Sequence, residues 1–411
     1  MGNKRAPEVR FPEFSGDWEE RKLSHLMEFS NGINAPKENY GKGRKMVSVM
    51  DILDDEPIIY KNIRNSVEVD DKTESKNKVE NGDLVFVRSS EIRDEVGWAK
   101  AYQQEEYALY SGFSIRGKKK SNFDAKFIEL TLNNANREQI ERKAGGSTRF
   151  NVSQSILESI VILEPTINEQ IALGDFFKQL DDTIALHQQE LTILKQTKQG
   201  FLQKMFPKEG ESVPEVRFPG FTGEWEERKV KDFSEETFGG GTPKTSIKEY
   251  WNGEIPWIQS SDLEEHQVSG IFARKKITEK GLRNSATKLI PKNSIAIVTR
   301  VGVGKIALIQ FEYATSQDFL SLSNLKVNEW FGVYSLYNQF QKELHNVQGT
   351  SIKGITKNEL LEKKINIPTD LKEQTKIGVF FKKLDNTIAL HQRELDALKE
   401  TKKAFLQKMF V

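Results

Sequence analysis

Two short segments place an arginine beside small residues at the end of an apolar run. Arg88 leads directly into Ser89 and Ser90, and Thr299 and Arg300 lead into a glycine-rich loop. Small residues let a guanidinium fork and nearby backbone amides approach a phosphate group or the edge of a guanine closely. A solvated strand end would show the same pattern, so both interpretations stay open.

Further basic and polar side chains are candidates for the same kind of contact. Arg149 and Lys353 follow two glycine-rich turns of similar sequence and form a matched pair of candidates. Runs of charge are more often solvated faces than binding sites, and Tyr250 could equally belong to the core. The remaining candidate contact residues are Lys42, Arg44, Lys45, Thr242, Lys244, Tyr250, Arg274 and Lys305.

Catalytic and metal-binding patterns are weak throughout the chain. Residues 302–305 read Gly-Val-Gly-Lys, but Thr299 stands where the first glycine of a phosphate-binding loop belongs, and Ile306 follows the lysine. No Pro-Pro pair exists, so the Asn/Asp-Pro-Pro-aromatic motif of adenine methyltransferases is absent. The chain has no cysteine, and its 5 histidines are scattered along the sequence. We therefore expect no catalytic residue and no metal site in this chain.

Length and charge set further limits. A chain of 411 residues predicts two or three domains. The 61 basic and 60 acidic residues leave a net charge of +1, so any contact with a polyanion must come from local patches. The sequence has no apolar run long enough to cross a membrane and no signal-peptide pattern after Met1, which predicts a soluble cytoplasmic protein.

The elements that must position these residues are indicated by an internal repeat. Residues 168–206 return as residues 372–410, and about two-thirds of the aligned positions match. Both copies lack proline and repeat apolar residues at alternating spacings of three and four, which predicts two long coiled-coil helices. The predicted seam residues are Phe177, Leu180, Ile184, His187, Leu191, Leu194, Phe381, Leu384, Ile388, His391, Leu395 and Leu398.

Connectivity predicts the direction of these helices. A globular segment joins the end of the first helix to the start of the second, and the ends of a compact domain lie close together. We therefore expect the helices to run antiparallel, with a domain at each end. The polar seam residues His187 and His391, together with Lys198 and Lys402, are expected to set register and orientation.

Two further pairs of segments repeat on either side of the domains. Residues 7–26 return as 214–233 with matched Phe, Pro, Gly and Trp positions, and residues 146–165 align with 349–368. The first pair predicts a strapping segment whose aromatic side chains pack on a domain or a helix end. The frame of each half is therefore duplicated.

The middles of the two halves, residues 27–145 and 234–348, are unlike in sequence. Each has short strand-like runs punctuated by Gly and Asn and is expected to end in a helix. We predict an α/β (α+β) protein with two tandem mixed domains, separated by two long antiparallel coiled-coil helices with pseudo-two-fold symmetry. The predicted boundaries are 1–167 for the first domain with its strap, 168–207 for the first helix, 208–371 for the second domain with its strap, and 372–411 for the second helix.

These features together resemble the specificity subunits of type I restriction-modification enzymes. The resemblance covers essentially the whole chain and is carried by the RFP…F.G.WEERK openings, the segment GGGTPKTSIKEYWNGEIPWIQSSDL at 239–263, and the EQ…FF..LD.TIALHQ.EL helices. It implies a non-catalytic subunit with two target recognition domains. Each of them would read one half of a split double-stranded DNA target.

The same resemblance implies partners and cofactors. In this family the helices act as a spacer and bind two methyltransferase subunits, which carry S-adenosylmethionine and methylate an adenine in each half-site. A motor-nuclease restriction subunit, which uses ATP with Mg, joins them to cut DNA. No cofactor is expected in this chain itself.

One alternative belongs to another functional class. A coiled-coil structural adaptor that presents two protein-binding domains would show the same duplicated frame. DNA retention at moderate salt that is lost steeply as salt rises would separate the two hypotheses, because phosphate contacts release counterions.

Overall fold

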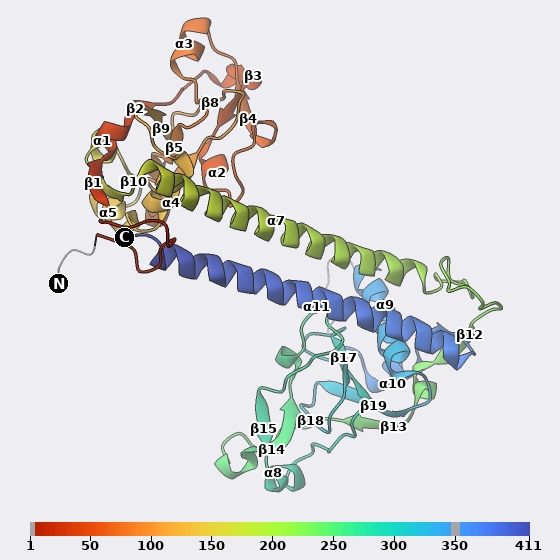
Figure 1. Cartoon of the computed structure of the whole chain (residues 1–411). Coiled ribbons are helices and arrows are strands. Elements are labelled where there is room, and N and C mark those ends of the chain that lie inside the picture. The colour runs from red at the N-terminus through yellow and green to blue at the C-terminus, as the bar shows by residue number, and fades with distance from the viewer. Residues whose placement is uncertain (1–4, 347–353) are drawn as a thin grey trace. The chain divides into compact units, whose positions relative to one another are not determined.

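The computed structural model describes residues 5–346 and 354–411, and its chain divides into two compact units (Figure 1). The first unit combines residues 1–187 with residues 394–411, and the second unit comprises residues 188–393. Each unit therefore contains part of both long helices. The sequence predicted four segments, two domains and two helices, whereas the two compact units each combine a domain with parts of both helices. The predicted segment boundaries therefore stay a prediction.

The first unit is a mixed α/β domain built on a four-stranded antiparallel sheet of order β2-β9-β5-β7. A second sheet of order β4-β3-β8 contains a parallel β3/β8 pair, and β1 pairs with β11 and β6 with β10. The elements are β1 Glu19–Lys22, α1 Leu23–Leu26, β2 Met27–Asn31, β3 Tyr40–Val47, α2 Val49–Ile52, β4 Asn65–Val67, α3 Asp71–Lys76, β5 Leu84–Val87, β6 Ser89–Ser90, β7 Ala99–Ala101, β8 Leu109–Tyr110, β9 Ser114–Lys119, α4 Ala125–Asn133, α5 Arg137–Lys143, β10 Phe150–Asn151, α6 Gln154–Glu158 and β11 Val161–Glu164.

The second unit repeats the topology of the two larger sheets and of the β1/β11 pair, and its described residues contain no counterpart of the β6/β10 pair. Its sheets have the orders β13-β19-β16-β17, β15-β14-β18 and β12-β20, and β14 pairs in parallel with β18. The elements are β12 Glu226–Lys229, β13 Ser234–Gly239, β14 Trp251–Ile258, β15 Lys275–Ile277, α8 Glu279–Arg283, β16 Ser294–Val298, β17 Ile306–Ile309, β18 Ala314–Thr315, β19 Phe319–Leu325, α9 Glu329–Asn346, α10 Lys357–Glu362 and β20 Lys364–Ile367. The two middles, unlike in sequence, therefore share one fold of the predicted mixed α/β class.

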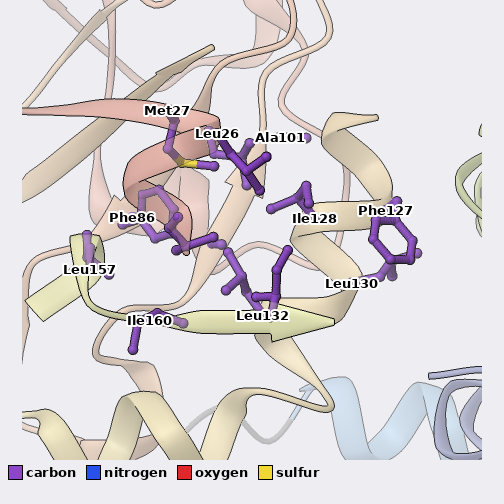
Figure 2. Close-up of a cluster of buried hydrophobic side chains, with 14 of the residues drawn as sticks. Leu26, Met27, Phe86, Ala101, Phe127, Ile128, Leu130, Leu132, Leu157 and Ile160 are labelled. Atoms are coloured by element: carbon purple, nitrogen blue, oxygen red, sulfur yellow. The ribbon is translucent and has the colours of Figure 1, made fainter. Parts of the chain in front are cut away.

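The central strand of each main sheet divides its side chains between two cores, as the two-residue period of a strand requires. In β5, Leu84 and Phe86 join the cluster that α4 covers with Ile128 and Leu132, which Figure 2 shows. Val85, in contrast, belongs to a separate cluster on the opposite face. In β16, residues 295 and 297 join one cluster while residues 296 and 298 join another.

The repeated stretches form α7 Ile167–Lys204 and α11 Leu371–Lys408, each 38 residues long. In the first unit, Phe176 packs edge-on against Phe405 at 5.3 Å, and one turn further along α7 Asp181 meets Lys402, one turn back along α11. Successive contacts thus move forward along α7 and backward along α11, so the segments run antiparallel, as predicted.

In the second unit, the remaining halves of α7 and α11 follow the same rule. Phe201 packs against Phe380 at 5.1 Å, Lys198 lies 2.6 Å from Asp385, and His391 lies 3.7 Å from Glu190. All twelve predicted seam residues are buried or half-buried. None of the helices in the described part of the chain is long and apolar enough to cross a membrane.

Candidate nucleic-acid interface

Three chain segments meet where β5 of the first unit ends. The backbone N–H of Arg88 donates to the carbonyl of Phe113 at 2.9 Å, and the N–H of Val152 donates to the carbonyl of Arg88 at 3.0 Å. β6 follows at once and pairs with β10. The strand end, the turn before β9 and the glycine-rich turn before β10 therefore form one continuous edge.

Predicted contact residues from two of these segments come together at this edge. Nε of Arg149 donates to Oγ of Ser89 at 2.8 Å, and Nη1 of Arg88 donates to the carbonyl of Gly112 at 3.2 Å. Ser90 is buried, and its hydroxyl donates to Glu95 at 2.5 Å. Arg149 is therefore the exposed cation of this edge, and Ser90 has a structural role.

A hollow of about 830 Å³ opens beside this edge. Arg88 and Lys143 line it together with the polar residues Asn31, Asn151, Ser153 and Gln154. Because it is wide and open and has two basic side chains in its lining, it suits a contact with a polyanion better than the enclosure of a small molecule.

The second unit builds the same edge from different residues. The N–H of Thr299 donates to the carbonyl of Asp318 at 2.7 Å, and the N–H of Ile355 donates to the carbonyl of Thr299 at 2.8 Å. Thr299 thus occupies the place of Arg88. Its buried hydroxyl donates to the backbone carbonyl of Asp318 at 3.0 Å. Arg300 is exposed. The candidate Lys353 lies outside the described residues.

Two further candidates lie near this second edge. Oγ1 of the exposed Thr242 donates to Oε1 of Gln317 at 2.6 Å, beside Asp318. Nζ of Lys305 donates to the carbonyl of Leu263 at 2.8 Å. Lys305 therefore ties the glycine-rich loop to a neighbouring segment instead of pointing freely outward.

The candidates on β3 form a second group, in the smaller sheet of the first unit. Arg44 lies 4.3 Å above the ring of Tyr107, donates to its hydroxyl at 2.9 Å and approaches Glu74 at 3.4 Å. The hydrogen bond from Tyr107 lowers the pKa of Glu74 and keeps this carboxylate charged opposite Arg44. Lys45 donates to the carbonyl of Ile63 at 2.7 Å, so Lys42 is the exposed candidate of this group.

Beside the matching sheet of the second unit, Lys244 and Tyr250 precede β14, and Arg274 precedes β15. Lys244 is exposed, and its carbonyl accepts a hydrogen bond from Trp251 at 3.3 Å. Tyr250 is half-buried, and Gly281 packs directly against its backbone. Arg274 is exposed and lies 3.6 Å from Asp262. Both interpretations of Tyr250 therefore stay open.

Arginine–glutamate pairs that sequence reasoning missed hold the straps in place. Arg10 forms two bonds of 2.7 Å to Glu169 at the start of α7, and Arg217 forms bonds of 2.6 and 2.8 Å to Glu373 at the start of α11. Both glutamates are buried. These pairs could have been found from the sequence, because the arginine and the glutamate each recur at matched positions of the repeated segments.

The glutamine that follows each glutamate joins a long helix to its domain. Gln170 accepts from the N–H of Asp124, which caps α4, and donates to the carbonyl of Pro165. Gln374 makes the equivalent bonds to Asn328 and Pro368. The helices and the domains that carry the candidate edges are thus fixed to one another by polar contacts repeated in both units.

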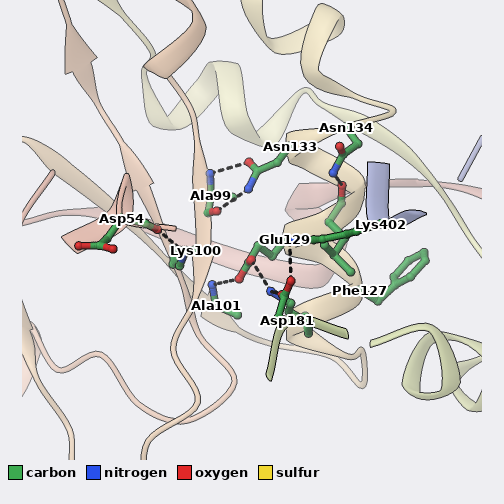
Figure 3. Close-up of polar contacts among 12 residues, drawn as sticks. Asp54, Ala99, Lys100, Ala101, Phe127, Glu129, Asn133, Asn134, Asp181 and Lys402 are labelled. Carbon is green, nitrogen blue, oxygen red and sulfur yellow. Dashed lines mark hydrogen bonds and ion pairs between the residues drawn. The ribbon is translucent and has the colours of Figure 1, made fainter. Parts of the chain in front are cut away.

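A charged junction joins α4 of the first unit to both long helices, as Figure 3 shows. Asp181 of α7 lies 2.5 Å from Lys402 of α11 and 3.3 Å from Lys126 of α4, which also pairs with Glu129 at 2.8 Å. Burial acts to lower the pKa of Lys126, but the carboxylates of Glu129 and Asp181 outweigh it and raise the pKa.

The second unit has a corresponding junction in which a tyrosine takes the place of Lys126 as the third partner. Asp385 pairs with Lys198 and accepts a hydrogen bond from the hydroxyl of Tyr334 at 2.6 Å. Burial and the adjacent carboxylate raise the pKa of Tyr334, so it stays protonated and donates. The predicted register role of Lys198 and Lys402 therefore takes the form of a lysine–aspartate pair in each unit.

Comparison with known proteins accounts for both halves of the chain. The family model described as type I restriction modification DNA specificity domain matches residues 15–196 and again residues 222–400. A Methanocaldococcus jannaschii protein described as the type I restriction enzyme MjaX specificity subunit is 22% identical over 408 residues, covering 96% of this chain and 93% of that protein.

Two other relatives match over shorter lengths. The MjaIX specificity subunit of Methanocaldococcus jannaschii is 29% identical over 46% of this chain and 44% of its own length. The Escherichia coli EcoR124I/EcoR124II specificity subunit is 33% identical over 36% of this chain and 38% of its own length. This chain therefore spans less than half the length of these two relatives in the matched regions.

Solved structures share the fold. The S subunit of a type I restriction-modification system from M. genitalium superimposes with a TM-score of 0.62 at 14% identity, covering 99% of both chains. A chain from a structure of the type I R-M system gives a TM-score of 0.55 over 96% of this chain and 97% of that one. Since the family model also covers most of the sequence in two copies, the chain belongs to the family of type I restriction-modification specificity subunits.

Proposed function

We propose that each unit binds one half of a bipartite double-stranded DNA target, and that α7 and α11 set the distance between the two half-sites. The observation that carries this proposal is the pair of matched sheet edges. The same backbone hydrogen bonds build both edges, yet Arg88 and Phe113 stand in one where Thr299 and Asp318 stand in the other. A matched frame with different side chains suits two readers of different base sequences.

The proposal includes partners that carry the chemistry. Two methyltransferase subunits would dock on the long helices and bring S-adenosylmethionine, and motor-nuclease subunits would bring ATP and Mg. The chain itself would contribute recognition only. Exposed apolar side chains on the long helices, such as Leu186 of α7 and Leu390 of α11, support a role for their outer surfaces in docking.

DNA binding by the full chain at a series of salt concentrations tests the first part. We expect retention of duplex DNA at moderate salt and a linear fall of log K with log salt, since lysine and arginine contacts to phosphate release counterions. Arg300→Ala is expected to weaken binding by about 1–3 kcal/mol if Arg300 binds a guanine bidentately. The matched control is Arg228→Ala, because Arg228 is an exposed arginine of β12 that pairs with Glu226.

The alternative, an adaptor that presents two protein-binding domains, makes the opposite prediction. An adaptor would show no salt-dependent retention of DNA, and Arg300→Ala would then behave like Arg228→Ala.

The proposed role of α7 and α11 as a spacer has its own test. Residues inserted at positions 185–187 should alter the spacer between half-sites or abolish activity, and unchanged spacing with full activity would remove the role of the helices as a ruler.

A further inference from the structure

The turn between β8 and β9 exposes an aromatic ring beside the candidate edge of the first unit. Phe113 keeps 58% of its surface exposed, although the residues on both sides of it are buried. A phenylalanine in a strand-connecting turn normally packs into the core, as Tyr110 does three residues earlier. Folding alone therefore does not account for the placement of this ring.

The turn holds Phe113 in a fixed position. The N–H of Ser114 donates to the carbonyl of Ser111 at 2.8 Å, and Arg88 donates both its backbone N–H and Nη1 to this turn. A Cβ added to Gly112 would lie 2.0 Å from Oδ1 of Asn34, so the side chain of Asn34 packs tightly against the turn. A rigid turn loses little conformational entropy when the ring meets a ligand.

Arg149 stands over the same ring. Its Cζ lies 5.9 Å from the centroid of Phe113, and its Nε is bound to Ser89 at 2.8 Å. The bond at Nε fixes the plane of the guanidinium, and the side chain as a whole is exposed. Nη1 lies 3.9 Å from the exposed carboxylate of Glu91, which is beyond hydrogen-bond distance.

This pair offers two recognition chemistries side by side. A guanidinium fork binds O6 and N7 of guanine, and an apolar ring contacts the C5 methyl group of thymine, both in the major groove. We propose that Phe113 contacts a thymine methyl group and Arg149 binds the guanine of a neighbouring base pair in the first half-site. Arg88 and Ser89 are positioning residues, since the first holds the turn and the second holds the guanidinium. The inference rests on the proposed DNA binding by the first unit.

The second unit does not repeat this chemistry. Asp318 takes the place of Phe113, and its carboxylate accepts from Oγ of Ser316 at 3.1 Å. A carboxylate cannot favour a methyl group, and in the major groove it accepts from the amino group of cytosine. Dependence on a thymine methyl group at this edge therefore belongs to the first half-site alone.

Changes of single groups on the DNA bases test the pair directly. Selection from random duplexes with the full chain first gives the target, and each thymine is then replaced by uracil and each guanine by 7-deazaguanine. We expect one uracil in the first half-site to weaken binding about fourfold, as for the loss of one buried methyl group. Phe113→Ala should bind the thymine and uracil duplexes equally. Arg149→Ala should lose roughly 5- to 150-fold on the intact site and become insensitive to one 7-deazaguanine.

Phe272→Ala is the matched control, because Phe272 is an 83% exposed phenylalanine of the second unit. It should keep the uracil effect in the first half-site. The inference is overturned if the wild-type chain tolerates uracil at every thymine of the first half-site, or if Phe113→Ala still distinguishes thymine from uracil. Failure of the underlying function looks different, since selection would then recover no preferred sequence at all.

Discussion

The two units repeat one fold and differ where the fold has edges. Strand order, the parallel pair of the smaller sheet and the backbone bonds of Arg88 and Thr299 correspond. The contacts that fix the frame are also repeated, with Arg10 and Glu169 matched by Arg217 and Glu373. The side chains that project from the frame are not repeated. Residues that hold the molecule together and the candidate contact residues thus lie at different places in each unit.

Differences also occur inside the frame, at places where two solutions are physically equivalent. In the first unit, Asn133 and Glu129 of α4 bind the free backbone groups of Ala99 and Ala101 on the edge strand β7 (Figure 3). In the second unit, the backbone of Val268 accepts from Leu308 on β17. Either arrangement satisfies an edge that would otherwise offer unpaired groups. The partners of the edge strand thus differ between the units, while in both units backbone groups of this strand are hydrogen-bonded.

The largest effect is expected from exchanging one middle for another. Replacing residues 27–145 with the corresponding segment of another family member should change the first half-site and leave the second unchanged, because each unit has its own edge. Sequencing of methylated sites in a host that supplies the methyltransferase measures both half-sites at once. Altered recognition in both halves would contradict independent readers.

The charged junction sets a condition on this exchange. Lys126 lies within the exchanged segment, whereas its partner Asp181 lies outside it. An insert that keeps a lysine or a hydrogen-bond donor opposite Asp181 should therefore fold better than one that places an apolar residue there. Comparison of two inserts that differ at this position alone separates a folding defect from a change of specificity.

The strap pairs should be equally important in both units. Arg10→Ala and Arg217→Ala each leave a buried glutamate uncompensated, which we expect to cost about 3–5 kcal/mol of unfolding free energy. Urea unfolding followed by far-UV circular dichroism measures the loss. Arg228→Ala, which breaks an exposed pair, should cost at most about 1 kcal/mol. A loss confined to Arg10 or to Arg217 would show that the frame is not equivalent in the two halves.

Sequence patterns were sufficient for much of this frame. The alternation of apolar residues predicted both long helices because only a buried seam explains it, and the structure buries or half-buries residues such as Phe177 and Phe381. Mixed α/β domains followed from short strand-like runs. That the two middles share one topology was not predictable, because their strands pack different residues at matched positions, as with Phe86 and Ile297.

The candidate edge was predictable only in part. Arg88, Ser89 and Arg149 were recognised by type, but their meeting depends on a pairing between β6 and β10 across about 60 residues of chain, which no local pattern encodes. Phe113 gave no signal, since an exposed and a buried phenylalanine look alike in sequence. Arg44 and Lys45 looked like free cations, and only the fold reveals that each is bound within the domain.

The lysine–aspartate pairs should differ between the units, although the sequence repeats them. The side chain of Lys198 is 9% exposed and that of Lys402 is 30% exposed. In Lys402→Met, Asp181 still has the positively charged Lys126 as a partner. In Lys198→Met, the partner that remains for Asp385 is the neutral hydroxyl of Tyr334. We expect losses of about 1 kcal/mol for Lys402→Met and about 3 kcal/mol for Lys198→Met in urea unfolding. Equal losses would mean that burial does not distinguish the two junctions.

The smallest effect concerns an exposed carboxylate of the second unit that lies between two lysines, at a position where the first unit has Ser159. Glu362 binds Lys229 and Lys231, and in the repeat of the first unit Ser24 stands at the position of Lys231. Hydrogen bonds from the two lysines lower the pKa of Glu362 from 4.5 to about 2. A lowered folded-state pKa contributes stability that is present above the unfolded value and lost as pH falls through the folded one. The contribution should therefore fade between about pH 5 and pH 2 and be absent in Glu362→Gln.

Titration of the Glu362 carboxyl carbon by NMR measures this pKa directly. Lys231→Ser gives the second unit the residue of the first, and it should raise the pKa of Glu362 toward 4.5 because one of the two donors is lost. High salt should act in the same direction, since the pair is exposed and screened. A pKa near 4.5 in the unaltered chain at low salt, or no response to Lys231→Ser, would show that the lysines do not hold this carboxylate in solution.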